Sequence, residues 1–146
     1  MNIRKIEFDD IGACADILCG VYNNEVWQCN WEKEIAVEYL MDYYNMSKFI
    51  GYVIEDKEWV LGAIFAHEKV WWNNREVFID EFFIKPKFQR KGYGSLLLKK
   101  IEEYVRQKNL AGITLSTNKY APAFKFYKKN AFIDCEHILF MCKEIK

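Results

Sequence analysis

Residues 89–95 read Gln-Arg-Lys-Gly-Tyr-Gly-Ser, and this stretch decides how the rest of the chain is interpreted. It follows an apolar run over residues 77–85 that is typical of a strand, and it precedes a helical pattern that ends near Lys108. A glycine-containing turn at a helix start presents backbone N–H groups at the positive end of the helix dipole. Gly92 and Gly94 let a phosphate approach the backbone without interference from a Cβ atom. The stretch, named here the glycine turn, therefore predicts a pyrophosphate site.

The charge around the glycine turn suits an anionic ligand. Residues 85–91 include four bases, Lys85, Lys87, Arg90 and Lys91. Residues 1–84 hold 16 acids and 7 bases, a balance of −9, whereas residues 85–146 hold 5 acids and 14 bases, a balance of +9. This division has two explanations of about equal weight. The charges can simply lie on ordinary solvated faces, or they can form a divided surface whose basic half attracts an anionic cofactor and whose acidic half attracts a cationic substrate.

The glycine turn resembles the acetyl-CoA motif of the GNAT superfamily of N-acetyltransferases, Gln/Arg-x-x-Gly-x-Gly/Ala. Gln89, Gly92 and Gly94 match that motif. The preceding residues 78–86, Phe-Ile-Asp-Glu-Phe-Phe-Ile-Lys-Pro, are similar to the fourth strand of the family and the turn after it. The motif alone is short, and its position between a strand and a helix makes the resemblance much more specific.

A second segment supports the same resemblance. Residues 126–132, Phe-Tyr-Lys-Lys-Asn-Ala-Phe, are similar to the late Phe/Leu-Tyr-x-x-x-Gly-Phe segment of the family. Ala131 stands where the family usually has Gly, and Tyr120 stands where Asn is common, although Asn118 lies two residues earlier. The resemblance is strong over residues 76–132 and extends in outline over the whole chain.

The composition fits one domain over residues 1–146 with a substantial apolar core, since 51% of the residues are hydrophobic. No apolar run approaches the length of a membrane helix, and the N-terminus lacks the apolar region of a signal peptide. The five cysteines are odd in number and form no Cys-x-x-Cys pair, which favours reduced thiols and a cytoplasmic location. No metal site is expected, because the two histidines, His67 and His137, show no ligand spacing with the cysteines.

Periodicity and turn residues predict a mixed α/β (α+β) fold. One turn is expected at residues 56–58 and a second at Asn73-Asn74, because Asn tolerates positive φ. Asp9 or Asp10 is expected to cap the first helix. The predicted fold is GNAT-like: a central, mixed, mostly antiparallel twisted sheet of about six to seven strands with helices on both faces. Strands are expected over residues 3–6, 49–55, 59–70, 76–84, 112–117, 131–135 and 138–143, and helices over residues 10–23, 31–44, 93–108 and 121–129.

Acetyl transfer to an amine needs a base for the amine proton, because a free alkylamine has a pKa of roughly 10. Glu81 is the main candidate for an acid–base or acceptor-orienting role, since the resemblance places an acid on this strand toward the acceptor. Asp80 is the alternative. Alternation places the two on opposite faces of the strand, so that only one can face the acceptor unless a bulge rotates the strand. Either acid can instead be a structural ion-pair partner.

The resemblance also assigns the remaining site residues. Tyr127 matches the family's tyrosine near the CoA sulfur and is the candidate general acid, with core packing as the alternative. Trp27, Trp31 and Trp72 are candidates for the acceptor pocket, although a structural role suits any single one of them at least as well. Asn118 binds the pantetheine arm or caps the next helix. The full set implied for the cofactor, through backbone or side chain, is Phe83, Ile84, Gln89, Arg90, Lys91, Gly92, Tyr93, Gly94, Ser95 and Asn118.

The leading hypothesis is therefore an acetyl-CoA-dependent N-acetyltransferase that uses direct attack in a ternary complex. A small cationic amine suits the acidic front half, and the front half loosely resembles aminoglycoside-type members. A protein or peptide amine is the first alternative, and a non-catalytic acyl-CoA sensor is the second. A different nucleotide-phosphate binder ranks last, because the P-loop lysine and the Gly-x-Gly-x-x-Gly pattern are absent. Neither nucleic acid nor a membrane is expected as a partner, and a homodimer is compatible with exposed sheet edges.

Overall fold

The computed structural model describes residues 1–146 and divides the chain into two compact units, Met1–Ser116 and Thr117–Lys146. Each unit is described by itself, and the expectation of a single domain stays a prediction. The elements follow the predicted order from the first strand through the last helix. No helix has both the length and the apolar composition that crossing a membrane requires.

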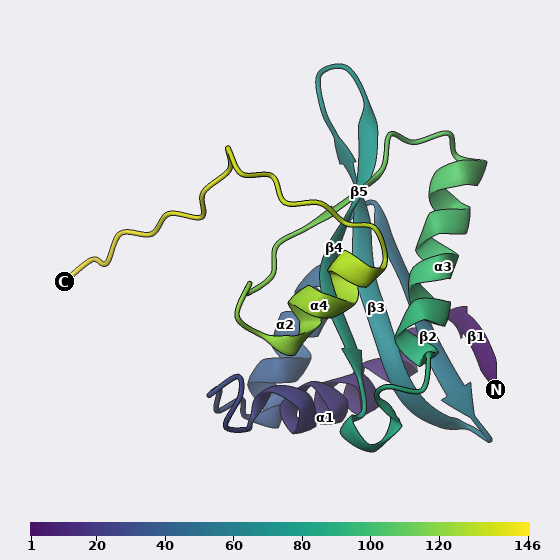
Figure 1. The fold of residues 1–146 in the computed structure, drawn as a ribbon. Coiled ribbons are helices and arrows are strands. Elements are labelled where there is room, and N and C mark those ends of the chain that lie inside the picture. Colours follow the sequence, from purple (N-terminus) through teal and green to yellow (C-terminus); the bar gives the residue numbers. More distant parts are fainter. The chain divides into compact units, whose positions relative to one another are not determined.

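The first unit is built on a five-stranded sheet whose spatial order, β1-β2-β3-β4-β5, follows the chain (Figure 1). β1 to β4 pair antiparallel, whereas β5 pairs parallel to β4 after the crossover through α3. The sheet is therefore mixed and mostly antiparallel, as predicted. The strands are β1 (Asn2–Lys5), β2 (Phe49–Asp56), β3 (Trp59–Val70), β4 (Arg75–Ile84) and β5 (Ile113–Leu115).

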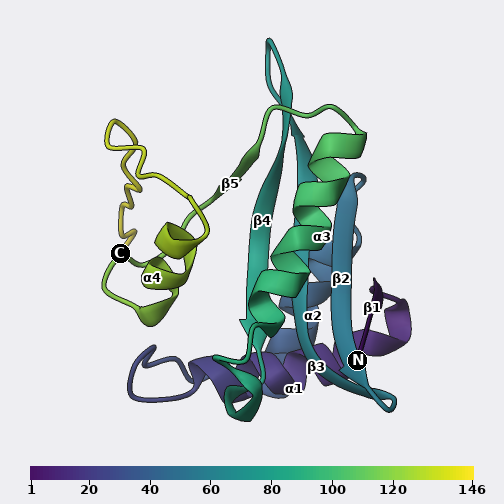
Figure 2. The ribbon, with the colours of Figure 1, turned by 45° about the vertical axis from the view of Figure 1, so that its right-hand side comes forward.

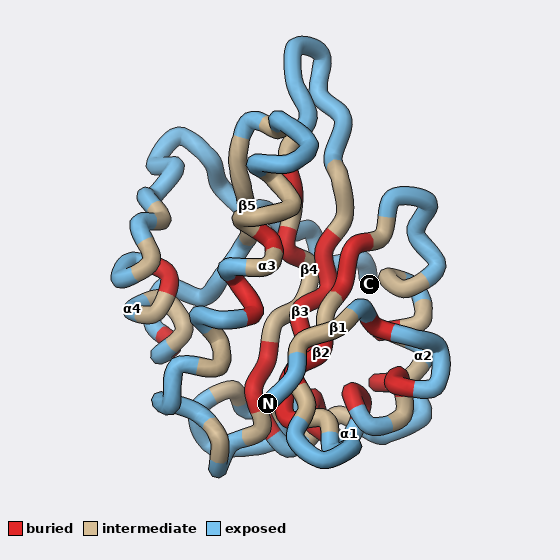
Figure 3. The backbone as a smooth tube through the Cα atoms, turned by 90° about the vertical axis from the view of Figure 1, so that its right-hand side faces the viewer, coloured by how far each residue is buried: buried red, intermediate tan, exposed pale blue.

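Helices cover both faces of this sheet, which confirms the predicted layers (Figure 2). Alternate residues of β3 separate the two sides. Ala63 and Phe65 join the core beneath α1 and α2, whereas Ile64 and Ala66, also buried, point to the face of α3. Figure 3 shows the buried backbone concentrated in the middle of the sheet. The helices are α1 (Ile11–Tyr22), α2 (Lys33–Tyr44) and α3 (Tyr93–Gln107), with short 3₁₀ turns η1 (Phe8–Asp10) and η2 (Pro86–Phe88).

Two local predictions need correction. Asp10 does not cap α1 through its side chain. Its carboxylate instead accepts the backbone N–H of Glu7 at 2.8 Å and binds both terminal nitrogens of Arg4 at 2.8 and 2.9 Å, because it lies inside the 3₁₀ turn before the helix. Positive φ occurs at Lys57 and Glu58, where the β2–β3 turn was expected, but not at Asn73 or Asn74. The β3–β4 turn is closed by an N–H···O bond from Trp71 to Asn74.

The second unit contains α4 (Pro122–Lys129) and no strand. The strands predicted over residues 131–135 and 138–143 are therefore wrong, and the strand count is lower than expected. Their apolar residues Ile133, Leu139, Phe140 and Met141 are at least 80% exposed, so the alternating pattern has no buried face to support a strand. Ala131 ends α4 with φ of 69°, the left-handed conformation that explains why related sequences favour Gly there.

Candidate active site

A β-bulge shapes the part of β4 that carries the two predicted acids. Glu81 pairs with Phe65 and Ile79 pairs with Ala66, so Asp80 is an extra residue with no partner on β3. The bulge cancels the expected alternation, and Asp80 and Glu81 both lie on the face covered by α1 and α2, as their hydrogen bonds show. The bulge exception to the expected alternation therefore applies, and both acids lie on the same side of the strand.

Glu81 is held by two tyrosines from different helices. The Tyr22 hydroxyl at the end of α1 donates to Oε1 and the Tyr39 hydroxyl in the middle of α2 donates to Oε2, each at 2.7 Å. Burial raises the pKa of Glu81 above its usual value, although both tyrosine hydrogen bonds act to lower it. A carboxylate with a raised pKa and a fixed orientation is suited to proton transfer or to holding an ammonium group.

Sequence reasoning missed the role of these tyrosines. Both lie on the apolar stripes of their helices, so they read as core residues. The available signal was the hydroxyl itself, because a buried tyrosine usually needs a hydrogen-bond partner. Aromatic contacts fix both rings, since Trp27 packs edge-on against Tyr22 at 5.0 Å between centroids, and Trp31 lies 4.9 Å from Tyr39.

Asp80 forms a separate pair with His67 of β3. Asp80 Oδ2 lies 2.6 Å from His67 Nδ1, and the two side chains are only 6% and 16% exposed. Burial raises the pKa of Asp80, against the lowering effect of the His67 hydrogen bond. No group of three or more His, Cys, Asp and Glu side chains occurs that could hold a metal ion.

The open edge of β4 begins at the same place. β5 pairs with β4 only as far as Ile79, so residues 80–84 of β4 continue without a neighbouring strand on that side. Phe83 and Ile84 are buried as whole residues, at 3% and 9% exposed. An extended ligand can pair with such an edge as an added strand. The Gln89 side chain donates to the Ile84 carbonyl at 2.9 Å and so links the strand end to the glycine turn.

The glycine turn leads directly into α3, as the sequence predicts. Gly92 is the N-cap residue with φ of 86°, a conformation that favours Gly, and no side chain caps the helix. A Cβ atom built on Gly92 would meet nothing within 4 Å, so the space in front of the turn is open. The first N–H groups of α3, from Tyr93, Gly94 and Ser95, are therefore available to an anion.

Basic side chains surround this opening. Arg90 and Lys91 are exposed, and Arg90 has φ of 61°. The Nζ atoms of Lys87 and Lys91 lie 5.3 and 5.5 Å from the centre of the Phe88 ring. This arrangement fits the pyrophosphate of a CoA molecule, because it combines uncapped helix amides, a glycine without steric obstruction and positive charge.

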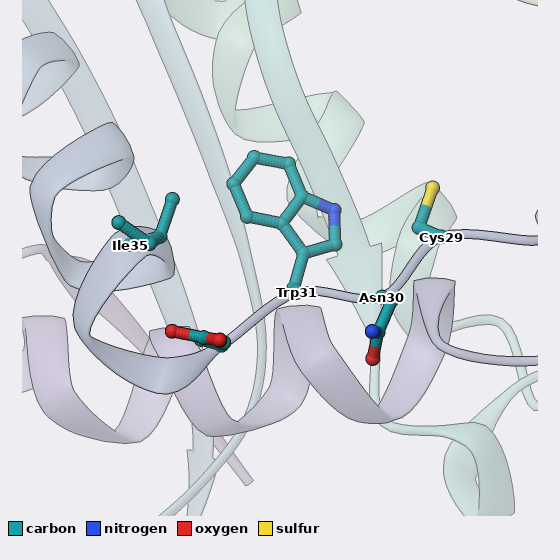
Figure 4. Close-up of a pocket in the computed structure, with 5 residues that line it drawn as sticks. Cys29, Asn30, Trp31 and Ile35 are labelled. Atoms are coloured by element: carbon teal, nitrogen blue, oxygen red, sulfur yellow. The ribbon is translucent and has the colours of Figure 1, made fainter.

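The three predicted tryptophans do not form one wall. Trp27 and Trp31 lie between α1 and α2 and contact the tyrosines that bind Glu81. Trp72 is 86% exposed at the β3–β4 turn, at the opposite end of β4 from the glycine turn. Ten residues of strand separate these ends, a span of roughly 30 Å. A pocket of about 500 Å³ opens beside Trp31 (Figure 4) and is lined by Cys29, Asn30, Trp31, Glu32 and Ile35.

Two predicted site residues belong to the second unit. Tyr127 is 9% exposed, and its ring makes edge contacts with Phe126 and Phe132 at 5.4 and 5.3 Å. The Asn118 side chain accepts the backbone N–H of Tyr120 at 2.9 Å, and its carbonyl accepts that of Ala121. Asn118 thus organises the turn before α4 but does not cap the helix, because the N-cap residue is Ala121 and no side chain caps it. The roles of both residues toward a ligand stay predictions.

The model of the acetyltransferase (GNAT) family matches residues 17–132 of the chain. The chain belongs to the GNAT acetyltransferase family. The predicted family and fold class are thereby confirmed, and the protein is an acetyltransferase-family member for which acetyl-CoA is the co-substrate. No curated protein matches the sequence significantly.

Solved structures share the fold at low sequence identity. A possible acetyltransferase from Clostridium difficile 630 has a TM-score of 0.83 at 17% identity and covers 99% of this chain and 98% of its own. An aminoglycoside acetyltransferase from an uncultured soil metagenomic sample, in complex with sisomicin, has a TM-score of 0.77 at 14% identity, with 99% and 96% covered. AAC(6')-Iy, in complex with a bisubstrate analogue of CoA and acetylneamine, has a TM-score of 0.73 at 14% identity, with 99% and 98% covered.

Proposed function

We propose that this GNAT member transfers the acetyl group of acetyl-CoA to a primary amine of a small cationic molecule. The observation that carries the proposal is the position of Glu81. Its carboxylate, fixed by Tyr22 and Tyr39, lies on the stretch of β4 that has lost its β5 neighbour and that leads into the glycine turn. A negative group for the amine and an anion site for the cofactor are thus joined by one short strand.

The residues of the first unit suit acetyl-CoA. The amides of residues 93–95 and the side chains of Arg90 and Lys91 would hold the pyrophosphate, and the backbone of Phe83 and Ile84 would pair with the pantetheine arm. Bound acetyl-CoA supplies an acetyl thioester, whose carbonyl carbon is open to attack by an amine. A β4 backbone N–H beyond the bulge would donate to the thioester oxygen as it gains negative charge. Tyr127 stays the candidate that protonates the leaving sulfur.

The acceptor side favours a cation. The pocket of Figure 4 is lined by Trp31 and by the exposed residue Glu32, and an indole and a carboxylate are both groups that can bind an ammonium ion. The α1–α2 segment and α2 add further acids at Glu25, Glu34, Glu38 and Asp42. The fold likeness to the structure named as an aminoglycoside acetyltransferase with bound sisomicin supports this substrate class by analogy only.

Direct transfer suits the cysteines better than an acetyl-cysteine intermediate does. Burial raises the pKa of Cys14 to about 12, and burial also raises the pKa of Cys19. Both thiols are therefore poor nucleophiles at neutral pH. Cys29 is exposed, and its Sγ contacts the Trp27 carbonyl at 3.6 Å but makes no hydrogen bond to a base.

The test is acetyl-CoA-dependent thiol release against aminoglycosides, polyamines, amino acids and short peptides. We expect release with polycationic small amines, and Glu81→Gln should lower kcat/KM for the amine by about 100-fold while leaving the Kd for acetyl-CoA within about twofold. Release only with peptides would replace the proposed acceptor class. Tight acetyl-CoA binding with no release for any amine would instead support the sensor alternative.

A further inference from the structure

We propose that His67, oriented by Asp80, is a further catalytic residue, and that its Nε2 takes the proton that the acceptor amine loses. The inference rests on the proposed function, because it assigns a proton acceptor for that reaction. Glu81 then attracts and orients the amine, while the proton passes to the neighbouring pair.

The contact with Asp80 sets which nitrogen of His67 is available. A carboxylate 2.6 Å from Nδ1 accepts the Nδ1–H hydrogen, so the neutral ring carries its lone pair on Nε2. Nε2 makes no hydrogen bond within the protein, and no fully buried side-chain nitrogen or oxygen lacks a partner, so Nε2 keeps some contact with solvent although the side chain is only 16% exposed. A carboxylate behind Nδ1 also stabilises the imidazolium that forms when Nε2 takes a proton.

The pair lies where β4 opens. Asp80 is the bulge residue and the first residue after Ile79, the last that β5 pairs with. Without the bulge, Asp80 and Glu81 would point to opposite faces, and the histidine pair would be separated from the carboxylate that faces the helices. Glu81 itself is a poorer terminal proton acceptor, because each of its oxygens already accepts a tyrosine hydroxyl.

The other charged groups on this face of the β3–β4 hairpin are few. Besides Asp80 and Glu81 they are Lys69, whose Nζ lies 5.5 Å from the centre of the Phe78 ring, and Glu76, which accepts a hydrogen bond from Thr114. β2 places only the apolar Phe49 beside His67, and α1 and α2 add the two tyrosine hydroxyls that donate to Glu81. Asp80 is the one charged group that bonds to the ring, which also packs against Phe78 at 5.7 Å between centroids.

The amine nitrogen forms the C–N bond to the acetyl carbon while the C–S bond breaks, and the electron pair of that bond leaves with the sulfur. The bound ammonium loses one proton to Nε2 of His67 before the attack, and His67 passes it to solvent. The second proton leaves the nitrogen as the C–N bond forms and ends on the thiolate that has left, and Asp80 stays a carboxylate throughout.

The first test compares three variants across pH. His67→Asn keeps a side-chain N–H that can donate to Asp80 but cannot take a proton, and His137→Asn changes the only other histidine, which is exposed in the second unit. We expect His67→Asn to lower kcat by about 100-fold, to leave KM for acetyl-CoA unchanged and to remove the acidic limb of the kcat/KM profile. His137→Asn should match the wild type, and Glu81→Gln should lose rate but keep the limb.

The opposite pattern overturns the inference. If His67→Asn retains the rate within twofold and keeps the acidic limb, the Asp80–His67 pair is structural only; if Glu81→Gln is the variant that loses the limb, Glu81 is the base. If the wild type acetylates amines and His67→Asn does so at the same rate, only the assignment of His67 is refuted. A wild type that binds acetyl-CoA and acetylates no amine sinks the proposed function itself.

A second measurement needs no turnover. In ¹⁵N NMR of the free protein, we expect the neutral His67 ring to carry its hydrogen on Nδ1, and Asp80→Ala to raise the share of the Nε2–H tautomer, because the carboxylate that accepts the Nδ1–H hydrogen is lost. The resonances of His137 serve as the internal control and should not move. An Nε2–H tautomer in the wild type, or a tautomer ratio that Asp80→Ala leaves unchanged, would contradict the geometry on which the inference depends.

Discussion

Replacement of Gly92 by Asp and by Asn separates the two properties that the glycine turn requires. Gly92 has φ of 86°, and a Cβ atom there would meet nothing within 4 Å. Both substitutions therefore strain the backbone without a clash, at a cost of about 1 kcal/mol each, and Asn and Asp are the residues that tolerate this conformation best. Both variants should fold, with a melting temperature lowered by about 2–5 °C.

The two variants differ only in charge, and this difference sets the expected loss of affinity. A carboxylate about 5 Å from a phosphate charge, at an effective dielectric constant of about 20, is repelled by about 3 kcal/mol. That energy corresponds to a decrease in affinity of about 150-fold. The Asp carboxylate also competes with the ligand for the positive end of the helix dipole.

Isothermal titration of CoA into the folded variants gives the test. Gly92→Asp should bind at least about 100-fold more weakly than Gly92→Asn at low ionic strength, and added salt should narrow the difference. Gly112→Asp is the matched control, because Gly112 also faces open space and lies before β5, at the other end of β4. Equal affinities of the Asp and Asn variants would refute the placement of the pyrophosphate at the turn.

Two further predictions concern stability. Burial alone would raise the pKa of Asp10, but the Arg4 guanidinium and the Glu7 N–H hold it below the usual value, so the contribution of Asp10 is present at neutral pH and is lost as the pH falls below about 4. Asp10→Asn should lower the free energy of unfolding by about 2 kcal/mol at pH 7, measured by urea unfolding. At pH 3 the gap between variant and wild type should be smaller, and a gap equal to that at pH 7 would contradict this prediction. Ala131→Gly should raise the melting temperature by about 2–5 °C, because Ala131 has φ of 69°, and a decrease would show that the left-handed end of α4 is wrong.

Local signals in the sequence determined most of the first unit. The alternation of β2 and β3, the amphipathic pattern of α3 and the basic glycine turn each depend on residues close together in the chain, so all were predicted within a few positions. Positive φ at Gly92 is likewise a local requirement, which is why the start of α3 could be read from two glycines. The motif also identified the family, which the match over residues 17–132 confirms.

The tertiary structure alone decided the chemistry around β4. Glu81 meets Tyr22 and Tyr39 across 59 and 42 residues of sequence, and Asp80 meets His67 across 13. No local pattern specifies these contacts, because a bulge depends on how two strands align and a buried hydroxyl finds its partner only after helices pack on the sheet. The residues after α4 show the converse. Their alternation suggested two strands, but a strand forms only where a neighbouring edge and a buried face support it, and their apolar side chains are exposed.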